Sequence, residues 1–162
     1  MTAARGLHKI PITILVCDDD EDDRMLTKLA LEGAHICNPL QFVGDGVQLL
    51  DYLHQRGPYA GELGLAPRPG LILMDLNMPN IDGREALRHI KEDASLRSIP
   101  VVVLTSSRLG RDVIESRELG VVAFIQKPVT LTGFLEAMNV LDRYWLQIVE
   151  MSPGGPNVRD VR

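Results

Sequence analysis

Short apolar runs alternate with longer segments of mixed polarity along this chain. The runs have four to six residues and lie at 12–17, 40–43, 71–76, 100–105 and 121–126. In runs such as "LIL" and "VVVL" the apolar residues are consecutive, a pattern typical of strands that are covered on both faces. We therefore predict five buried strands.

The segments between and after these runs have the spacing of helices. "DDRMLTKLALEGA" places Met25, Leu26, Leu29 and Ala30 at helical intervals. "RDVIESRELG" predicts another helix that ends at Gly120. The segment "TLTGFLEAMNVLDRYWLQIVEM" predicts one long last helix.

Two further helices carry signals at their N-termini. Asp45 is a good N-cap residue, and Gln48 stands three residues later, at the capping-box position. In "DGREALRHIKED", Asp82 is likewise a good N-cap residue, and Glu85 stands three residues later at the capping-box position. The segment 57–69 is rich in Gly, Ala and Pro and predicts a long loop.

The alternation of strands and helices predicts an α/β fold with a parallel sheet and helices on both faces. The length of 162 residues fits one domain, and the net charge of −5 gives no basis for nucleic-acid binding. No apolar run is long enough to cross a membrane. With only two cysteines, Cys17 and Cys37, the composition suggests a reducing compartment, so we expect a cytoplasmic protein.

Polar side chains stand where four of the predicted strands end. They are Asp18 and Asp19 after the first strand, Asp75 at the end of the third, Thr105 at the end of the fourth and Lys127 after the fifth. Because ligands of open α/β sheets bind beyond the carboxyl ends of the strands, we expect these groups to converge.

Three converging carboxylates repel one another unless a cation joins them. Mg2+ takes carboxylate, water and phosphate oxygens as ligands, while Lys127 offers a positive charge and Thr105 a hydroxyl to an anion. A carboxylate nucleophile, a cation and donors for an anion are the groups needed for phosphoryl transfer to a carboxylate.

The stretches "ILVCDDDEDDR", "LILMDLNMPNIDG", "PVVVLTSS" and "FIQKP" occur in this order on the predicted elements. With them the chain resembles the receiver domain of two-component response regulators, from about Ile12 to about Leu141. The resemblance implies a doubly wound (βα)5 fold with a five-stranded parallel sheet in the flavodoxin-like order 2-1-3-4-5.

The resemblance also implies roles for single residues. Asp75 matches the phosphoacceptor. Asp18 and Asp19 match the acid pair that holds Mg2+, together with Asp75 and the backbone carbonyl of Asn77, and Mn2+ or Ca2+ can substitute.

Three other residues match the switch and the phosphoryl contact of the family. Thr105 matches the switch hydroxyl, Phe124 the switch aromatic residue, and Lys127 the phosphoryl contact, with an expected cis bond to Pro128. Such a protein is a phosphoacceptor in signalling rather than an enzyme, with slow self-catalysed dephosphorylation. Its phosphodonor is a histidine kinase.

A narrower resemblance is to the single-domain regulators paired with phytochrome histidine kinases. It rests on "DDDEDDRMLTKLAL", on the long segment before "LILMDLNMPNIDG", and on the extension "YWLQIVEM". The implied partner is a bacteriophytochrome. The implied organisation is a lead at 1–11, a receiver domain with an extended last helix at 12–150 and a flexible tail at 151–162.

Apolar residues continue past the point where a minimal receiver domain ends. They are Tyr144, Trp145, Leu146, Ile148 and Val149. Because exposed apolar patches commonly mark partner surfaces, we expect them to cover either the domain's own flank or a second subunit, and we predict a homodimer.

Two other functions compete with this interpretation. A phosphatase of the haloacid dehalogenase type would require a second Asp two residues after the nucleophile, where this chain has Asn77. A receiver-like scaffold that acts without phosphorylation would not need the complete set of pocket residues.

The acidic run itself has a rival interpretation as a calcium-binding loop. An EF-hand loop that starts at Asp18 would need Gly and Glu where Asp23 and Leu29 stand, so we exclude it. We instead assign Asp20, Glu21, Asp22 and Asp23 to the first turn of a helix and to solvent.

Overall fold

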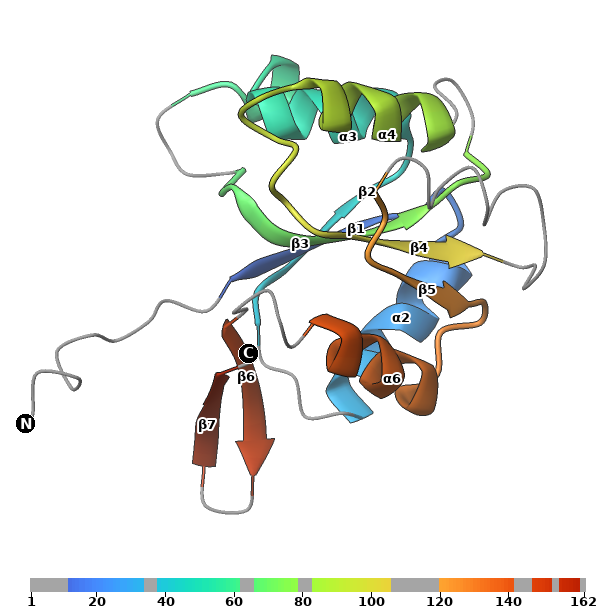
Figure 1. The fold of residues 1–162 in the computed structure, drawn as a ribbon, viewed down its shortest axis with the longest axis vertical. Helices are drawn as coiled ribbons and strands as arrows, with labels where there is room; N and C mark the ends of the chain where they lie inside the picture. The colour runs from blue at the N-terminus through green and yellow to red at the C-terminus, as the bar shows by residue number, and fades with distance from the viewer. Residues whose placement is uncertain are drawn as a thin grey trace, which may run out of the picture.

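The computed structural model describes residues 12–33, 38–61, 66–78, 83–105, 120–141, 147–152 and 155–160. Five strands form one parallel sheet in the order β2-β1-β3-β4-β5 (Figure 1). The strands are β1 (Thr13–Cys17), β2 (Leu40–Val43), β3 (Pro69–Asp75), β4 (Val101–Thr105) and β5 (Ala123–Gln126). The predicted fold class and strand order are confirmed.

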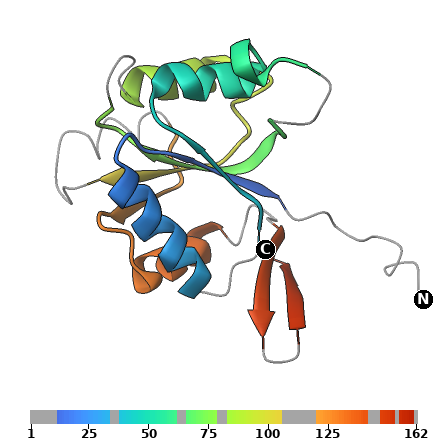
Figure 2. The same ribbon diagram turned by 180° about the vertical axis from the view of Figure 1, so that it is seen from behind.

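Helices cover both faces of the sheet. The helices α3 (Gly46–His54) and α4 (Gly83–Glu92) lie on one face, and α2 (Glu21–Gly33) and α6 (Leu131–Leu141) lie on the other (Figures 1 and 2). The helix predicted at 111–120 lies outside the described residues, apart from Gly120, and so does the predicted N-cap Asp82.

The sheet divides the hydrophobic core in two, because successive residues of a strand point to opposite faces. Ile14 and Val16 of β1 pack with Phe134 on the side of α2 and α6. Leu15 and Cys17 pack with Leu87 on the side of α3 and α4. This packing on both faces explains why the strands are apolar at consecutive positions.

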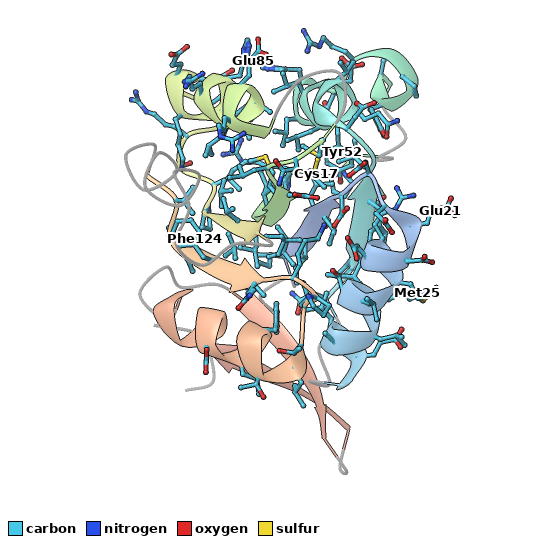
Figure 3. The ribbon with its side chains drawn as sticks, turned by 90° about the vertical axis from the view of Figure 1, so that its right-hand side faces the viewer. Cys17, Glu21, Met25, Tyr52, Glu85 and Phe124 are labelled. Atoms are coloured by element: carbon cyan, nitrogen blue, oxygen red, sulfur yellow. The ribbon has the colours of Figure 1, made fainter. Side chains whose placement is uncertain are left out.

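Helix α2 turns a different face to the sheet from the one that its apolar residues predict. Met25 and Leu29 are 53% and 52% exposed, and Leu26 is 42% exposed. The buried positions of this helix include Thr27 and Leu31 instead. Met25 points outward from α2 in Figure 3. The apolar pattern therefore predicted the helix but not its orientation.

The N-terminus of α3 has the predicted cap. Asp45 Oδ1 accepts a hydrogen bond from the backbone N–H of Gln48 at 2.7 Å, and Gln48 Oε1 accepts one from the N–H of Gly44 at 2.8 Å. The two side chains thus satisfy backbone donors that would otherwise lack partners at the helix end.

The long segment between α3 and β3 is attached to α3 through a buried tyrosine. Tyr52 donates a hydrogen bond from its hydroxyl to the carbonyl of Pro67 at 2.9 Å. Its ring meets that of Tyr59, in the 3-10 helix η1 (Gly57–Tyr59), edge to face at 5.2 Å. Burial raises the pKa of Tyr52 to about 12, so the phenol remains a donor at physiological pH.

The predicted long last helix is wrong in part, while the flexible tail stays a prediction. Helix α6 ends at Leu141, and β6 (Gln147–Ser152) pairs antiparallel with β7 (Gly155–Asp160). Ile148 and Val149 belong to β6, in agreement with the strand preference of β-branched residues. The sequence "SPGGP" that follows is unfavourable in a helix. Tyr144, Trp145 and Leu146 lie outside the described residues.

Within the described residues, no helix has the length and apolar character needed to cross a membrane.

Gly83, the first residue of α4, packs against the backbone that follows β3. Its N–H donates to the carbonyl of Leu76 at 3.0 Å, and a Cβ at this position would lie 2.5 Å from Leu76 Cα and 2.7 Å from the carbonyl oxygen of Asp75. Because these neighbours are backbone atoms, they cannot rotate away. Only glycine fits here without moving the segment that carries Asp75.

We predict that Gly83→Ala destabilises the protein by about 1–3 kcal/mol, the usual cost of overpacking. Urea unfolding followed by circular dichroism measures this as a lower midpoint. Gly33→Ala is the matched control, since a Cβ at Gly33 meets nothing within 4 Å. Equal midpoints for Gly83→Ala and Gly33→Ala would contradict the close packing at Gly83.

Candidate functional site

Charged side chains from three strands meet beyond the carboxyl ends of the sheet. Asp75 is the last residue of β3, Asp18 directly follows β1, and Lys127 directly follows β5. Lys127 Nζ lies 2.8 Å from Asp75 Oδ2 and 2.9 Å from Asp18 Oδ2. The structure thus brings together three of the residues that the sequence placed at the strand ends.

Lys127 has a third carboxylate partner, Asp23, which the sequence predicted only as part of the first turn of a helix. Asp23 Oδ2 lies 2.7 Å from Lys127 Nζ, and the Asp23 side chain is 31% exposed. Asp23 precedes Thr27 by four residues and Ala30 by seven, so it continues the buried face of α2. The sequence alone did not reveal this relation, because the buried face of α2 carries Thr27 rather than the apolar residues Met25 and Leu29.

Short backbone turns fix the carboxylates that surround Lys127. Asp18 Oδ1 accepts a hydrogen bond from the N–H of Asp20 at 3.0 Å, and Asp75 Oδ1 accepts one from the N–H of Asn77 at 2.9 Å. Each side chain therefore keeps its Oδ2 for Lys127 while Oδ1 is held by the chain two residues later.

The rest of the acidic run has several functions in the fold. Asp20 Oδ1 accepts hydrogen bonds from the N–H groups of Asp22 at 2.8 Å and Asp23 at 3.0 Å, which makes Asp20 the cap of α2. Glu21 and Asp22 are exposed in the first turn, where carboxylates favour the positive end of the helix dipole. The assignment to the start of a helix is correct for all four residues, since Asp23 also lies in the first turn of α2, but the sequence did not predict the ion pair of Asp23 with Lys127.

The site is crowded with negative charge, and the pKa values reflect this. Burial raises the pKa of Asp18, although its contacts with Lys127 act in the opposite direction. Burial alone would lower the pKa of Lys127, but the bonds to Asp23, Asp75 and Asp18 outweigh it and raise that pKa above its ordinary value. Lys127 is therefore a permanent cation in the pH range of a cell.

The carboxylates have the geometry of a site for a divalent cation. Ligand oxygens of Asp18, Asp19 and Asp75 all lie within 4.8 Å of one another. Asp18 is fully buried, and no donor is aligned for a hydrogen bond to its Oδ2, although Lys127 is at ion-pair distance. A buried carboxylate oxygen with free lone pairs, beside two more carboxylates, fits a hard cation that prefers oxygen.

The other predicted site residues lie near this group or have side chains outside the described part. Asn77 is exposed just beyond Asp75. Thr105 ends β4, paired in register with Gln126, and its side chain is not among those described. Phe124 on β5 is half-buried against the core on the α3 and α4 side (Figure 3). The bond between Lys127 and Pro128 is cis, as predicted.

A buried thiol, Cys17, ends strand β1 directly before Asp18. Cys17 Sγ is 3.2 Å from Met78 Sδ, and burial together with the charges of Asp18, Asp45 and Asp75 raises the pKa of the thiol well above its ordinary value. Cys17 is therefore a core residue on the α3 and α4 side of the sheet, and its protonated thiol is not a nucleophile.

Comparison with known proteins identifies a family that this chain matches. A family model described as the response regulator receiver domain matches residues 14–139. Response regulator Rcp1 of Synechocystis sp. is 38% identical over 141 residues, which cover 87% of this chain and 93% of Rcp1.

Two solved structures are similar over most of the chain. The bacteriophytochrome response regulator RtBRR has a TM-score of 0.76 and 42% identity, and the match covers 90% of this chain and 86% of RtBRR. The Mn(2+)-bound form of Rcp1 has a TM-score of 0.67 and 38% identity, with 84% of this chain and 95% of Rcp1 covered.

We predict that Asp18→Asn stabilises the protein in metal-free buffer at neutral pH. Because burial raises the pKa of Asp18, its ionised form opposes folding, and this cost disappears only as the pH falls through the raised pKa. Asp23 and Asp75 still neutralise Lys127 in the variant. We expect the thermal midpoint to rise by a few degrees, since ~1 kcal/mol corresponds to roughly 2–4 °C in a domain of this size.

Differential scanning fluorimetry measures the midpoint with and without a divalent cation. Added cation should raise the midpoint of the parent protein more than that of Asp18→Asn. Glu92→Gln, which removes an exposed carboxylate from the end of α4, is the matched control and should match the parent in both buffers. A lower thermal midpoint for Asp18→Asn than for Glu92→Gln in metal-free buffer would show that ionised Asp18 does not oppose folding.

Proposed function

The chain belongs to the response regulator receiver family, whose domains accept phosphoryl groups in two-component signalling, and we propose that Asp75 is the acceptor in this one. The observation that carries the proposal is the position of Asp75. Its carboxylate stands at the end of a central strand, is 6% exposed, and lies 2.8 Å from Lys127 and in ligand range of Asp18 and Asp19.

The residues around Asp75 suit the transfer step. A carboxylate oxygen of Asp75 forms a bond to phosphorus, while the bond from phosphorus to the imidazole nitrogen of a kinase phosphohistidine breaks and the nitrogen keeps its electron pair. Lys127 stabilises the negative charge on the phosphoryl oxygens. The N–H of Asn77 holds the carboxylate in one orientation during the attack.

Receiver domains bind a divalent metal, and we propose Mg2+ for this chain, with Mn2+ or Ca2+ as substitutes. Asp18, Asp19, Asp75 and the backbone carbonyl of Asn77 would hold it, in keeping with the cluster of carboxylate oxygens. When bound, the ion neutralises charge on the phosphoryl oxygens. The same oxygen ligands fit a hard cation better than a softer one such as Zn2+.

The response to phosphorylation involves Thr105 and Phe124 in this proposal. Thr105 lies at the end of β4, next to the strands that carry Asp75 and Lys127, so it is close enough in the sheet to respond to a phosphoryl group. Phe124 is half-buried, which leaves it room to change its packing. Loss of the phosphoryl group by slow self-catalysed hydrolysis would return the domain to its resting state.

We also propose that the phosphodonor is a histidine kinase of the phytochrome class. The support is the similarity to RtBRR, which is named a bacteriophytochrome response regulator. The free thiol of Cys17 is in keeping with a cytoplasmic location, where such a kinase domain would be found. The division into a lead at 1–11, a receiver domain at 12–150 and a flexible tail at 151–162 remains part of the proposal.

We predict that Asp75→Asn abolishes phosphorylation because the amide cannot act as the nucleophile. Acetyl phosphate with Mg2+ should label the parent protein with an acid-stable, base-labile phosphoryl group, and chelation of the metal should prevent labelling. Asp22→Asn, an exposed residue of the acidic run, is the matched control and should be labelled like the parent. Label retained in Asp75→Asn would refute the assignment.

The kinase proposal is tested with a second donor in the same assay. An autophosphorylated bacteriophytochrome kinase should transfer its phosphoryl group to the parent chain and to Asp22→Asn. Transfer from an unrelated histidine kinase but not from the bacteriophytochrome would refute the phytochrome pathway and leave the receiver function standing.

We predict a homodimer that uses the chain beyond α6. The apolar residues there are Tyr144, Trp145, Leu146, Ile148 and Val149. Multi-angle light scattering at micromolar concentration should give the mass of two chains, and Trp145→Asp should shift it to one. A mass of one chain for the parent protein, with and without acetyl phosphate, would contradict the dimer.

A further inference from the structure

Asp23 holds the closest of the three carboxylates around Lys127, yet neither metal binding nor phosphoryl transfer requires it. The distances from Lys127 Nζ are 2.7 Å to Asp23, 2.8 Å to Asp75 and 2.9 Å to Asp18. We infer that Asp23 is a positioning residue, which keeps the Lys127 ammonium in place while the phosphoryl group arrives at Asp75. This inference rests on the proposed function of Asp75.

Three carboxylates surround the Lys127 ammonium in this structure. A lysine ammonium has three N–H bonds, and one carboxylate oxygen lies at ion-pair distance for each of them. Lys127 itself is only 14% exposed at its side chain, so water is a minor competitor. A phosphoryl oxygen that approaches Lys127 therefore competes with carboxylates that already lie within 2.9 Å of the ammonium.

Two of the three partners change during the reaction. Asp75 loses its full negative charge when one oxygen becomes bonded to phosphorus. Asp18 belongs to the group of carboxylates that can hold the divalent cation, and its Oδ2 is the oxygen that now faces Lys127. Both attractions on the ammonium therefore weaken as the phosphoryl group and the cation occupy the site.

Asp23 is the partner that does not change. It lies on α2 rather than at the end of a strand, and it is not a member of the group of carboxylates that can share a cation. Its backbone is fixed by the cap, because its N–H donates to Asp20 Oδ1 at 3.0 Å. The contact between Asp23 and Lys127 therefore persists through the transfer and holds the ammonium where negative charge develops.

Loss of the contact between Asp23 and Lys127 should affect the transition state and not the binding of the phosphodonor. Without it, Lys127 has fewer restraints in the transition state, whereas a small phosphodonor in the ground state makes no contact with Asp23. We expect the maximal labelling rate of Asp23→Asn to fall roughly tenfold, the low end of what one hydrogen bond to a charged group contributes. The acetyl phosphate concentration at half-maximal rate should be unchanged.

The test compares labelling rates at a range of acetyl phosphate concentrations with saturating Mg2+. Asp23→Glu, which retains the carboxylate, should recover most of the rate, and Asp22→Asn should behave like the parent. In a Lys127→Met background, Asp23→Asn should cause no further loss, because the residue acts through the lysine. In metal-free protein, the NMR signal of the Lys127 ammonium should be narrow in the parent and broader in Asp23→Asn.

Three results would overturn the inference. The first is a labelling rate of Asp23→Asn equal to that of the parent. The second is that Asp23→Asn lowers the rate as much in the Lys127→Met background as in the parent. The third is that Asp22→Asn lowers the rate as much as Asp23→Asn does. The Asp75→Asn variant distinguishes a failure of the acceptor role of Asp75 from a failure of the positioning role of Asp23. If it still accepts label, the proposed function fails; if it does not and Asp23→Asn matches the parent, only the role of Asp23 fails.

Discussion

One ammonium group lies within ion-pair distance of three carboxylates that the fold gathers at the rim of its sheet. Asp18 and Asp75 are placed there by strands β1 and β3, Asp23 by α2, and Lys127 reaches all three from the end of β5. Without that charge, buried carboxylates a few ångströms apart would repel one another strongly. The same crowding makes the site receptive to a second, divalent cation, since these three carboxylates and that of Asp19 exceed what one lysine can neutralise.

Much of the site could be predicted from the sequence because the carboxyl ends of parallel strands lie at the same edge of the sheet. The positions of Asp18, Asp75 and Lys127 after apolar runs required only the topology, and the topology followed from alternating strands and helices. Asp23 was missed for a different reason. In a run of six acidic residues, local pattern cannot tell a helix-capping residue from one that reaches a lysine far along the chain.

The orientation of α2 shows the physical origin of that failure. The apolar pattern favoured Met25 and Leu29 as core residues, but both are more than half exposed, while Thr27 is buried. A helix rotated to bury Met25 and Leu29 would turn Asp23 away from Lys127. The ion pair and the apolar pattern therefore favour different rotations. Similarly, the strand pairing of β6 and β7 depends on contacts between segments that a helical pattern in one segment does not reveal.

The separation of the charged residues along the chain has a consequence for synthesis and folding. Asp75 and Lys127 are 52 residues apart in the sequence, and Lys127 follows the last strand of the sheet. A chain emerging from the ribosome presents its acidic residues long before their counter-ion, and contacts of such sequence separation form late in folding. The acceptor pocket is thus complete only when the whole sheet is assembled.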